Sequence, residues 1–392
     1  MRHQRFIAPL LPIALSLTVG IIIGHHVTLE ATILLASLII LMAITFCMSR
    51  FPHMQTLLIC IQTIVIGCYL IQHPLPDIPM VQRAGDRMLD YRQQLLLQYQ
   101  RQIRPETYEI VAAMTLGDKS ALTPETKETF NITGAGHILA ISGLHLGIIY
   151  MMVSLLVRGR RERLVAQVIT LLLLWAFTFL VGMSPSVVRA TTMLTVYGLL
   201  SLGYRRKMSL NVLAFTAILL LIIHPDALFN IGFQMSFLAV SAILLFYPLL
   251  NGLISEKWLM EHRLIRWLWG TTALSLAAQI GVAPLIAFYF HRFSTYFLLS
   301  NFIVIPGAYL ILVGGFLLLI THWSIISYIL NKVTAWMMMA LHGISTLPYA
   351  GIDGIYLSVL QVVLIYFFIF ICAYFLYFYF VLCSLNRTFA PN

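Results

Sequence analysis

Ser142 and His145 are the residues whose types and spacing first suggest chemistry. They stand three positions apart in a mostly apolar stretch, residues 136–157, so a helix there would place them on one face. A histidine beside a serine hydroxyl can activate a nucleophile, which would make this chain an intramembrane serine hydrolase. That pair lacks an evident carboxylate to orient the histidine, and the two side chains could instead line a polar path through a membrane. A packing histidine with satisfied hydrogen bonds is the simplest alternative.

Arg189 is the second candidate, because it lies four residues into an otherwise uncharged apolar span. A cation at such depth costs about 2.5–3.5 kcal/mol on insertion scales unless it faces a cavity or a partner. A guanidinium group offers a planar fork of donors that matches the oxygens of a phosphate. The sequence therefore favours a phosphate contact, and an arginine that reaches up to the membrane interface is the alternative.

Further polar side chains lie in or beside apolar segments. They can line a path for a solute, or they can hydrogen-bond between helices, at about 1 kcal/mol each. We predict a channel or DNA path that is lined by Ser142, Gly143, His145, Ser184, Ser186, Arg189, Gln234, Ser236, Gln279 and Asn301. Conduction requires sites that are favourable enough to enter and weak enough to leave, and one arginine among hydroxyls and amides would supply them.

The elements that must position these residues are membrane-spanning helices. Of the 392 residues, 60% are hydrophobic and 10% are charged, and apolar segments of about 20 residues, long enough to cross a bilayer, recur along the chain. We predict an all-α, polytopic integral membrane protein with roughly ten to twelve transmembrane helices. The expected spans are residues 6–24, 29–48, 56–72, 136–157, 164–182, 185–203, 208–223, 235–253, 267–290, 296–321, 325–347 and 357–384.

Two segments depart from a simple span. In lipid every backbone N–H and C=O must be paired, so the glycines, histidines and serine of residues 136–157 are tolerable only inside protein or beside a wet cavity. Broken helices of this kind often mark the binding site of a transporter. Residues 226–236 are too short and polar to span, and we expect a re-entrant or interfacial piece there.

Basic clusters between the spans account for most of the formal net charge of +10. Such clusters favour the cytoplasmic side of a membrane. One of them contains Lys257, Arg263 and Arg266, and the nearby Trp258 and Trp267 suit the level of the lipid headgroups. We therefore place this loop at the cytoplasmic surface.

Residues 73–135 form the long polar region, which we predict to be an extracytoplasmic amphipathic connector. From Val81 to Ile103 apolar residues recur at three and four positions, the period of one face of a surface helix. Acids nearly balance its arginines, which weakens the case for a DNA-binding stripe. Thr123 has the hydroxyl, and the next two residues the proline and acid, of a helix start. Asp118 could cap a helix or pair with an arginine.

Metal, nucleotide and redox chemistry have no support in the sequence. The five cysteines lie in or beside hydrophobic runs without CxxC spacing, and HExxH, P-loop and GxGxxG motifs are absent. We expect no cofactor, no metal and no catalytic residue, so the chain is not expected to be an enzyme.

Several motifs resemble, in order, those of the ComEC family of bacterial competence proteins. They are Gly117-Asp118 with Leu122-Thr123-Pro124, Gly134-Ala135-Gly136-His137, residues 139–145 (LAISGLH), residues 184–190 (SPSVVRA), His224-Pro225, residues 232–237 (GFQMSF), Ala277-Ala278-Gln279, and Asn301 with Pro306. The resemblance covers about residues 109–321. It also marks Asp118, Gly134, Pro225, Gly232 and Pro306 as positions of structural motifs.

The resemblance implies a multi-pass protein of the bacterial cytoplasmic membrane that passes one strand of incoming DNA into the cell during natural transformation. Its partners would be single-stranded DNA, membrane lipid, a DNA receptor, a cytoplasmic motor, a separate nuclease and further copies of itself in a homo-oligomer. A transporter of a smaller anionic or lipid-like solute is the remaining alternative.

The same resemblance suggests how the chain is divided. We expect an N-terminal three-helix membrane region over residues 1–72, the connector over 73–135, a competence-type channel core over 136–323 and C-terminal transmembrane helices over 324–392. Longer family members carry an OB-like and a metallo-β-lactamase-like domain. We expect neither in this chain, which would then be a transport core.

Overall fold

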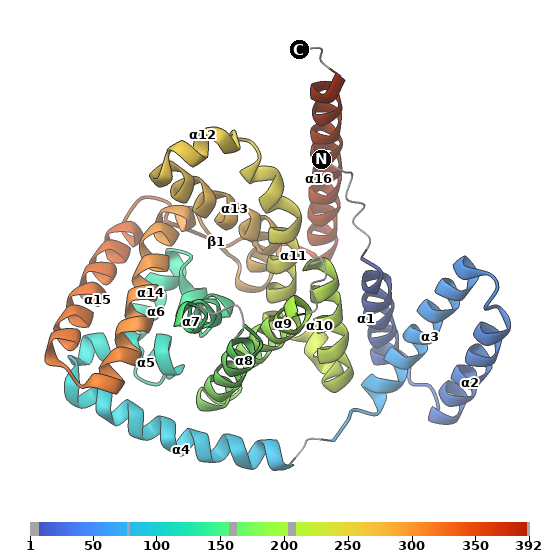
Figure 1. Ribbon diagram of the computed structural model, residues 1–392, viewed down its shortest axis with the longest axis horizontal. Coiled ribbons are helices and arrows are strands. Elements are labelled where there is room, and N and C mark those ends of the chain that lie inside the picture. The colour runs from blue at the N-terminus through green and yellow to red at the C-terminus, as the bar shows by residue number, and fades with distance from the viewer. Residues whose placement is uncertain (1–7, 77–78, 157–162, 203–208, 390–392) are drawn as a thin grey trace. The chain divides into compact units, whose positions relative to one another are not determined.

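The computed structural model describes residues 8–76, 79–156, 163–202 and 209–389, and they are almost entirely helical (Figure 1). The first half contains α1 (Leu10–His26), α2 (Ala31–Cys47), α3 (Pro52–Gln72), α4 (Pro79–Gln102), α5 (Pro105–Leu116), α6 (Pro124–Ile132), η1 (Gly136–Ile138), α7 (Gly143–Leu156), α8 (Arg163–Leu180) and α9 (Pro185–Leu202). The second half contains α10 (Ser209–Ile223), η2 (Pro225–Phe229), α11 (Ile231–Asn251), α12 (Glu256–Glu261), α13 (Arg263–Phe290), β1 (Arg292–Ser294), α14 (Phe297–Thr321), α15 (Ser324–Ser345), β2 (Gly351–Asp353) and α16 (Val359–Phe389). The predicted all-α class is confirmed.

Six of the described helices, α3, α11, α13, α14, α15 and α16, are long and apolar enough to cross a membrane. Five shorter apolar helices, α1, α2, α7, α8 and α10, accompany them. The protein is therefore a multi-pass membrane protein, as predicted. The break in residues 136–157 is present, because the chain forms the short η1 and then begins a new helix, α7, at Gly143.

Residues 226–236 contain a short helix, and the long helix after it begins earlier than expected. The short helix η2 ends at Phe229 and α11 begins at Ile231, so the long helix starts several residues earlier than predicted. The reason is a local cap: Oδ1 of Asn230 accepts the backbone N–H groups of Gly232 at 2.9 Å and Phe233 at 3.3 Å. An asparagine cap at this place satisfies donors that a helix start otherwise leaves unpaired.

The contacts divide the chain into two compact units. One comprises Met1–Leu89 and Ile149–Phe237, and the other comprises Asp90–Ile148 and Leu238–Asn392. The division passes through α4, α7 and α11. The four sequence regions proposed above stay a prediction.

In the first unit, α1 and α3 pack backbone to backbone. A Cβ atom added to Gly20 would lie 2.1 Å from the carbonyl oxygen of Ile64, and one added to Gly67 would lie 2.6 Å from that of Leu17. Sγ of Cys68 also donates to the Gly20 carbonyl at 3.1 Å. Small residues are the usual means by which membrane helices approach closely, since lipid supplies no hydrophobic drive to press them together.

The helices α8 and α9 pack against each other as a pair. The turn between them contains Gly182 and Met183, both in the left-handed region, at φ 78° and φ 50°. The hydroxyls of Thr178 and Thr191 hydrogen-bond across the pair at 2.7 Å, and Nε1 of Trp175 donates to Thr195 at 3.2 Å. These polar contacts hold the N-terminal half of α9, which carries Arg189, against α8.

In the second unit, α5 is a largely buried helix. Every residue from Thr107 to Leu116 is buried, and α5 packs against α14 and α15. The description of residues 73–135 as a polar connector did not anticipate this element. Its apolar run is only about ten residues long, and a short run is not distinguished from a surface segment by periodicity alone.

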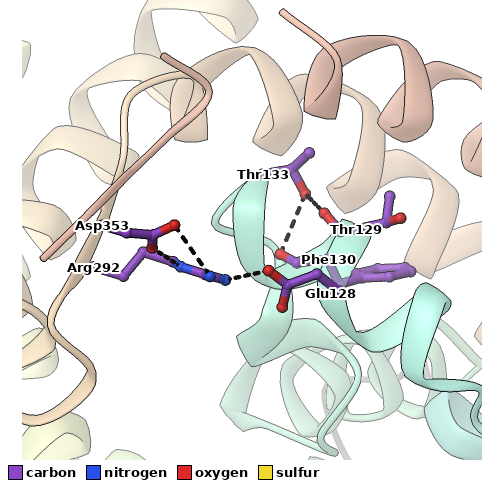
Figure 2. Close-up of polar contacts among 6 residues, drawn as sticks. All are labelled: Glu128, Thr129, Phe130, Thr133, Arg292 and Asp353. Carbon is purple, nitrogen blue, oxygen red and sulfur yellow. Dashed lines mark hydrogen bonds and ion pairs between the residues drawn. The ribbon is translucent and has the colours of Figure 1, made fainter. Parts of the chain in front are cut away.

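A two-stranded antiparallel ribbon joins distant parts of the second unit. β1 pairs with β2 in a register that places Arg292 opposite Asp353. Figure 2 shows the Arg292 guanidinium between two acids: it hydrogen-bonds Asp353 on β2, and Nη1 lies 2.8 Å from Oε1 of Glu128 on α6. The ribbon is thereby tied to the helix that leads into the broken segment.

Candidate membrane transport site

His145 lies in the second unit, at the start of α7, and is fully buried. Its Nδ1 accepts the backbone N–H of Ser142 at 3.2 Å and lies 3.1 Å from the Ser142 hydroxyl. Ser142 directly precedes the helix, and His145 is its third residue. This is the backward half of a capping box, in which a side chain at the third position pairs the donor of the cap residue, at roughly 1 kcal/mol per cap.

This contact determines the tautomer of the ring. Because Nδ1 accepts a backbone N–H, the neutral imidazole carries its proton on Nε2. Nε2 is buried and has no hydrogen-bond partner among the described residues. A buried donor without a partner costs about 1–3 kcal/mol, so a water or a passing polar group would find a favourable contact there.

Arg189 lies in the first unit, in the second turn of α9, and the residue is 6% exposed. Its Nη2 donates to the carbonyl oxygen of Gly232 at 2.8 Å, while its Nε is buried without a partner among the described residues. The guanidinium is thus held against the first turn of α11. The hydrogen bond thus joins α9 to α11 through two residues that are 43 positions apart in the chain.

Gln234 and Pro225 shape the approach to that helix. Nε2 of Gln234 donates to the carbonyl oxygen of Leu228 at 3.0 Å, which ties α11 back to η2. Pro225 is buried at the first position of η2. Ser236, one turn into α11, is partly buried. The amide of Gln234 therefore has a structural role within this turn.

Ser184 and Ser186 stand at the start of α9. The Ser184 carbonyl accepts the N–H groups of Val187 at 2.9 Å and Val188 at 3.0 Å, and the two serine hydroxyls are 3.4 Å apart. The helix start, the serine pair and Arg189 thus share one end of α9.

Asn301 and Gln279 belong to the second unit. Nδ2 of Asn301 donates to the hydroxyl of Ser275 at 3.1 Å, which joins α14 to α13, and its Oδ1 is buried without a partner among the described residues. Gln279 lies one turn further along α13 and is partly buried. Pro306 lies inside α14, five residues beyond Asn301.

The predicted structural residues Asp118 and Gly134 have clear local roles. Asp118 accepts both the backbone N–H and the hydroxyl of Ser120, at 3.2 and 3.0 Å, and Nη2 of Arg92 lies 3.7 Å from its Oδ1. Both a turn and an arginine contact are therefore present. Gly134 adopts φ +75° after α6, and a Cβ there would lie 3.0 Å from the side chains of Ser294 and Phe297. Only glycine combines that backbone conformation with so close an approach.

Glu109 is a buried acid that the sequence analysis did not single out. Its Oε2 accepts the backbone N–H of Thr123 at 2.9 Å and its Oε1 accepts the hydroxyl of Thr126 at 2.7 Å. The predicted cap is confirmed, since the Thr123 hydroxyl accepts the N–H of Thr126 at 3.2 Å. The missed signal was an acid inside an apolar run that precedes a Thr-Pro-Glu helix start.

The predicted path residues are divided between the two units. Ser184, Ser186, Arg189, Gln234 and Ser236 belong to the first, and Ser142, Gly143, His145, Gln279 and Asn301 belong to the second. The structure brings Arg189 next to Gly232, and Ser142 next to His145. That all ten residues line one path stays a prediction. Within the described part of the chain, His, Cys, Asp and Glu side chains form no group of three or more that could hold a metal ion.

Comparison with known proteins gives a consistent result. The profile of the competence protein family matches residues 114–379. ComE operon protein 3 of Bacillus subtilis (strain 168) is 35% identical over 207 residues, which are 52% of this chain and 25% of that protein. An uncharacterized protein of Aquifex aeolicus (strain VF5) is 37% identical over 170 residues, 43% of this chain and 37% of that protein.

A third relative, the uncharacterized protein YcaI of Escherichia coli (strain K12), is 25% identical over 235 residues, which are 55% of this chain and 29% of that protein. The chain thus spans between a quarter and somewhat over a third of the length of these relatives. No solved structure matches it.

Proposed function

Because the chain belongs to the competence protein family, we propose that it conducts single-stranded DNA across the bacterial cytoplasmic membrane during natural transformation. The similarity to ComE operon protein 3 of Bacillus subtilis supports a role in competence. The multi-pass helical structure is what a conduit requires, because helices pair all their backbone groups within lipid. The DNA strand, its direction of movement and the cytoplasmic membrane are parts of the proposal.

Arg189 is the observation that carries the proposal. Arg189 is 6% exposed and lies on a helix that the sequence predicts to cross the membrane, where a cation is costly unless it serves a polar ligand or a polar neighbour. One of its nitrogens is bonded to the Gly232 carbonyl, and a second, Nε, is unpartnered among the described residues. A guanidinium that is held by one nitrogen can bind a phosphate through its other donors while it stays in position. A DNA strand would then move as each phosphate on the arginine is replaced by the next one along the strand.

The chemistry of the other path residues fits a polyanion that must not be trapped. Hydroxyls and amides offer neutral hydrogen bonds, which bind a phosphate more weakly than an arginine does. Ser184 and Ser186 lie on the same helix end as Arg189, so a phosphate leaving the arginine would meet hydroxyls next. The motor that drives such movement and the nuclease that supplies one strand would be separate proteins, and a DNA receptor and a homo-oligomeric assembly belong to the same proposal.

An intramembrane serine hydrolase is the second candidate, favoured by the 3.1 Å contact between the Ser142 hydroxyl and His145. Two features count against it. The nitrogen that faces the hydroxyl already accepts the Ser142 backbone N–H, and the far nitrogen, Nε2, has no orienting carboxylate among the described residues. A fluorophosphonate probe should leave Ser142 unlabelled, and stoichiometric labelling of Ser142 would support the hydrolase instead.

Transport of a smaller anionic or lipid-like solute is the third candidate. Uptake by liposomes that contain the purified chain separates it from DNA conduction. Under an inward electrical potential, we expect fluorescent single-stranded oligonucleotides to enter the liposomes and double-stranded DNA of the same length to stay outside. Entry of small phosphate esters without entry of the oligonucleotide would contradict the proposal.

A further inference from the structure

An open groove lies on the second unit, between α11 and the first part of α13. It is lined by Tyr247, Arg266, Trp267, Gly270, Thr271 and Leu274 and has a volume of about 310 Å³. It contains none of the predicted path residues. From this groove we propose that the protein binds an anionic phospholipid at this position, with the lipid phosphate on Arg266.

The charge of Arg266 is the first reason. Its side chain is exposed, and it takes part in none of the ion pairs found among the described residues. Its Nη1 donates to the thioether sulfur of Met260 at 3.0 Å, and a thioether is a weak acceptor. The guanidinium therefore retains donors for a stronger acceptor, and phosphate oxygens match its planar fork.

The lining has the polarity of a lipid. Five of the six lining residues lie on α13, from Arg266 to Leu274, a distance of about 12 Å along a helix. The charged end, Arg266, is next to the start of α13, and Leu274, 42% exposed, lies deeper along the helix. A lipid could place its charged headgroup at Arg266 and its acyl chain along Leu274.

Gly270 leaves the room for such a ligand. It lies at the middle of the groove, and no heavy atom lies within 4 Å of the place where a Cβ would be. Trp267, 47% exposed, and Tyr247 of α11 also line the groove. Aromatic side chains with a polar edge gather at the level of lipid headgroups, so the groove has the composition of a membrane interface.

The loop before α13 indicates which lipid is bound. The short helix α12 carries Trp258, 43% exposed. From Glu256 to Arg266 the chain holds three cations, Lys257, Arg263 and Arg266, and two acids. Lysine and arginine in short loops favour the cytoplasmic surface, and acids there contribute little to orientation. The cytoplasmic leaflet is rich in anionic lipids, and each cation near it contributes about 1 kcal/mol of attraction. The occupant we propose is therefore an anionic glycerophospholipid such as phosphatidylglycerol. The site is independent of the proposed DNA path.

Native mass spectrometry of the detergent-purified full chain tests this proposal. The probes are dioleoylphosphatidylglycerol and, as a neutral reference with the same acyl chains, dioleoylphosphatidylcholine. The wild type should retain phosphatidylglycerol in preference, and Arg266→Gln should lower that retention about five-fold, as expected for one lost cation near a membrane surface. Gly270→Leu, which fills the groove without changing the charge, should lower it similarly.

Arg263→Gln is the matched control, because it removes the same charge from the same helix outside the groove. It should retain phosphatidylglycerol like the wild type. Equal losses in Arg263→Gln and Arg266→Gln would mean that the charge of the loop, and no site, attracts the lipid, and this would overturn the proposal.

Competition experiments distinguish the sources of phosphate. Glycerol 3-phosphate should not displace the lipid, because it lacks the acyl chains that Leu274 and Trp267 would contact. Displacement by glycerol 3-phosphate would overturn the lipid assignment in favour of a soluble phosphate. Displacement by a short oligothymidylate, lost in Arg266→Gln, would overturn it in favour of DNA.

Discussion

Arg189 and Gly232 are joined by a hydrogen bond of 2.8 Å from the guanidinium Nη2 to the backbone carbonyl oxygen. The bond links the second turn of α9 to the first turn of α11, and Gly232 has no side chain to interpose: a Cβ there would lie 3.4 Å from Nη2. The two motifs SPSVVRA and GFQMSF, which are separate in the sequence, therefore meet at one buried cation.

Arg189→Leu should abolish transformation while the protein inserts at normal abundance, because the proposed phosphate contact is lost. Arg189→Lys should retain part of it, since an ammonium group still attracts phosphate but lacks the planar fork. The measurement is transformation frequency beside immunoblotted membrane protein, with Arg263→Leu as the control for loss of an exposed arginine. If Arg189→Leu transforms like the parent, Arg189 has no part in the path.

Two substitutions of His145 should distinguish a role as a helix cap from a role in transport. His145→Gln keeps an acceptor that can pair the Ser142 N–H but removes the Nε2–H donor, whereas His145→Leu removes both. We expect His145→Leu to lower the free energy of unfolding by about 1–3 kcal/mol, because the buried N–H of Ser142 loses its acceptor. His145→Gln should lower it by less, because the glutamine can still accept that N–H. Both variants should lose transformation. Normal transformation by a well-folded Gln variant would show that His145 serves only as a helix cap.

Gly20→Ala should destabilise the first unit, because its Cβ would lie 2.1 Å from the Ile64 carbonyl oxygen and would force α1 and α3 apart. The loss should be of the size seen for overpacked cores, about 1–3 kcal/mol. Thermal unfolding of the purified protein in detergent measures it. Gly343→Ala is the matched control, since nothing lies within 4 Å of its added Cβ. Equal melting temperatures of the two variants would contradict the close packing of α1 on α3.

Arg292→Ala should cost little, about 0–1 kcal/mol, because its partners Glu128 and Asp353 are 49% and 62% exposed and solvent screens the pairs. The hydrogen bond to Asp353 raises the pKa of Arg292 above its ordinary value. When folding raises the pKa of a base, the resulting stabilisation of the folded state is fully present at any pH below the ordinary pKa. It is lost only as the pH rises through the raised pKa of the folded state.

The effect of Arg292→Ala on unfolding free energy should therefore stay constant from about pH 7 to about pH 9. Denaturant unfolding of wild type and variant across this range is the check. A difference that shrinks steadily towards alkaline pH would show that another group, with a lower pKa, holds the ribbon to α6.

Much of the fold could be read from local patterns. The lengths of the apolar runs predicted the all-α, multi-pass class. The glycines and Ser142 predicted the break before α7, because a helix start and a backbone break depend on residues a few positions apart. The cap at Thr123 was predicted for the same reason. The short buried helix α5 and the two-stranded ribbon were not predicted, because a run of ten apolar residues and strands of three residues carry too little pattern.

The sequence by itself determined that this chain is an all-α membrane protein of the competence family, and which polar residues stand in its apolar segments. Only the tertiary structure decided what those residues contact. Arg189 meets a carbonyl 43 residues away, Asn301 meets Ser275, and Arg292 meets Asp353 at a separation of 61. His145, by contrast, turns back to a neighbour three residues away. The type of a side chain is local information, whereas its partner depends on which helices pack together, and that is settled by the contacts of the whole chain.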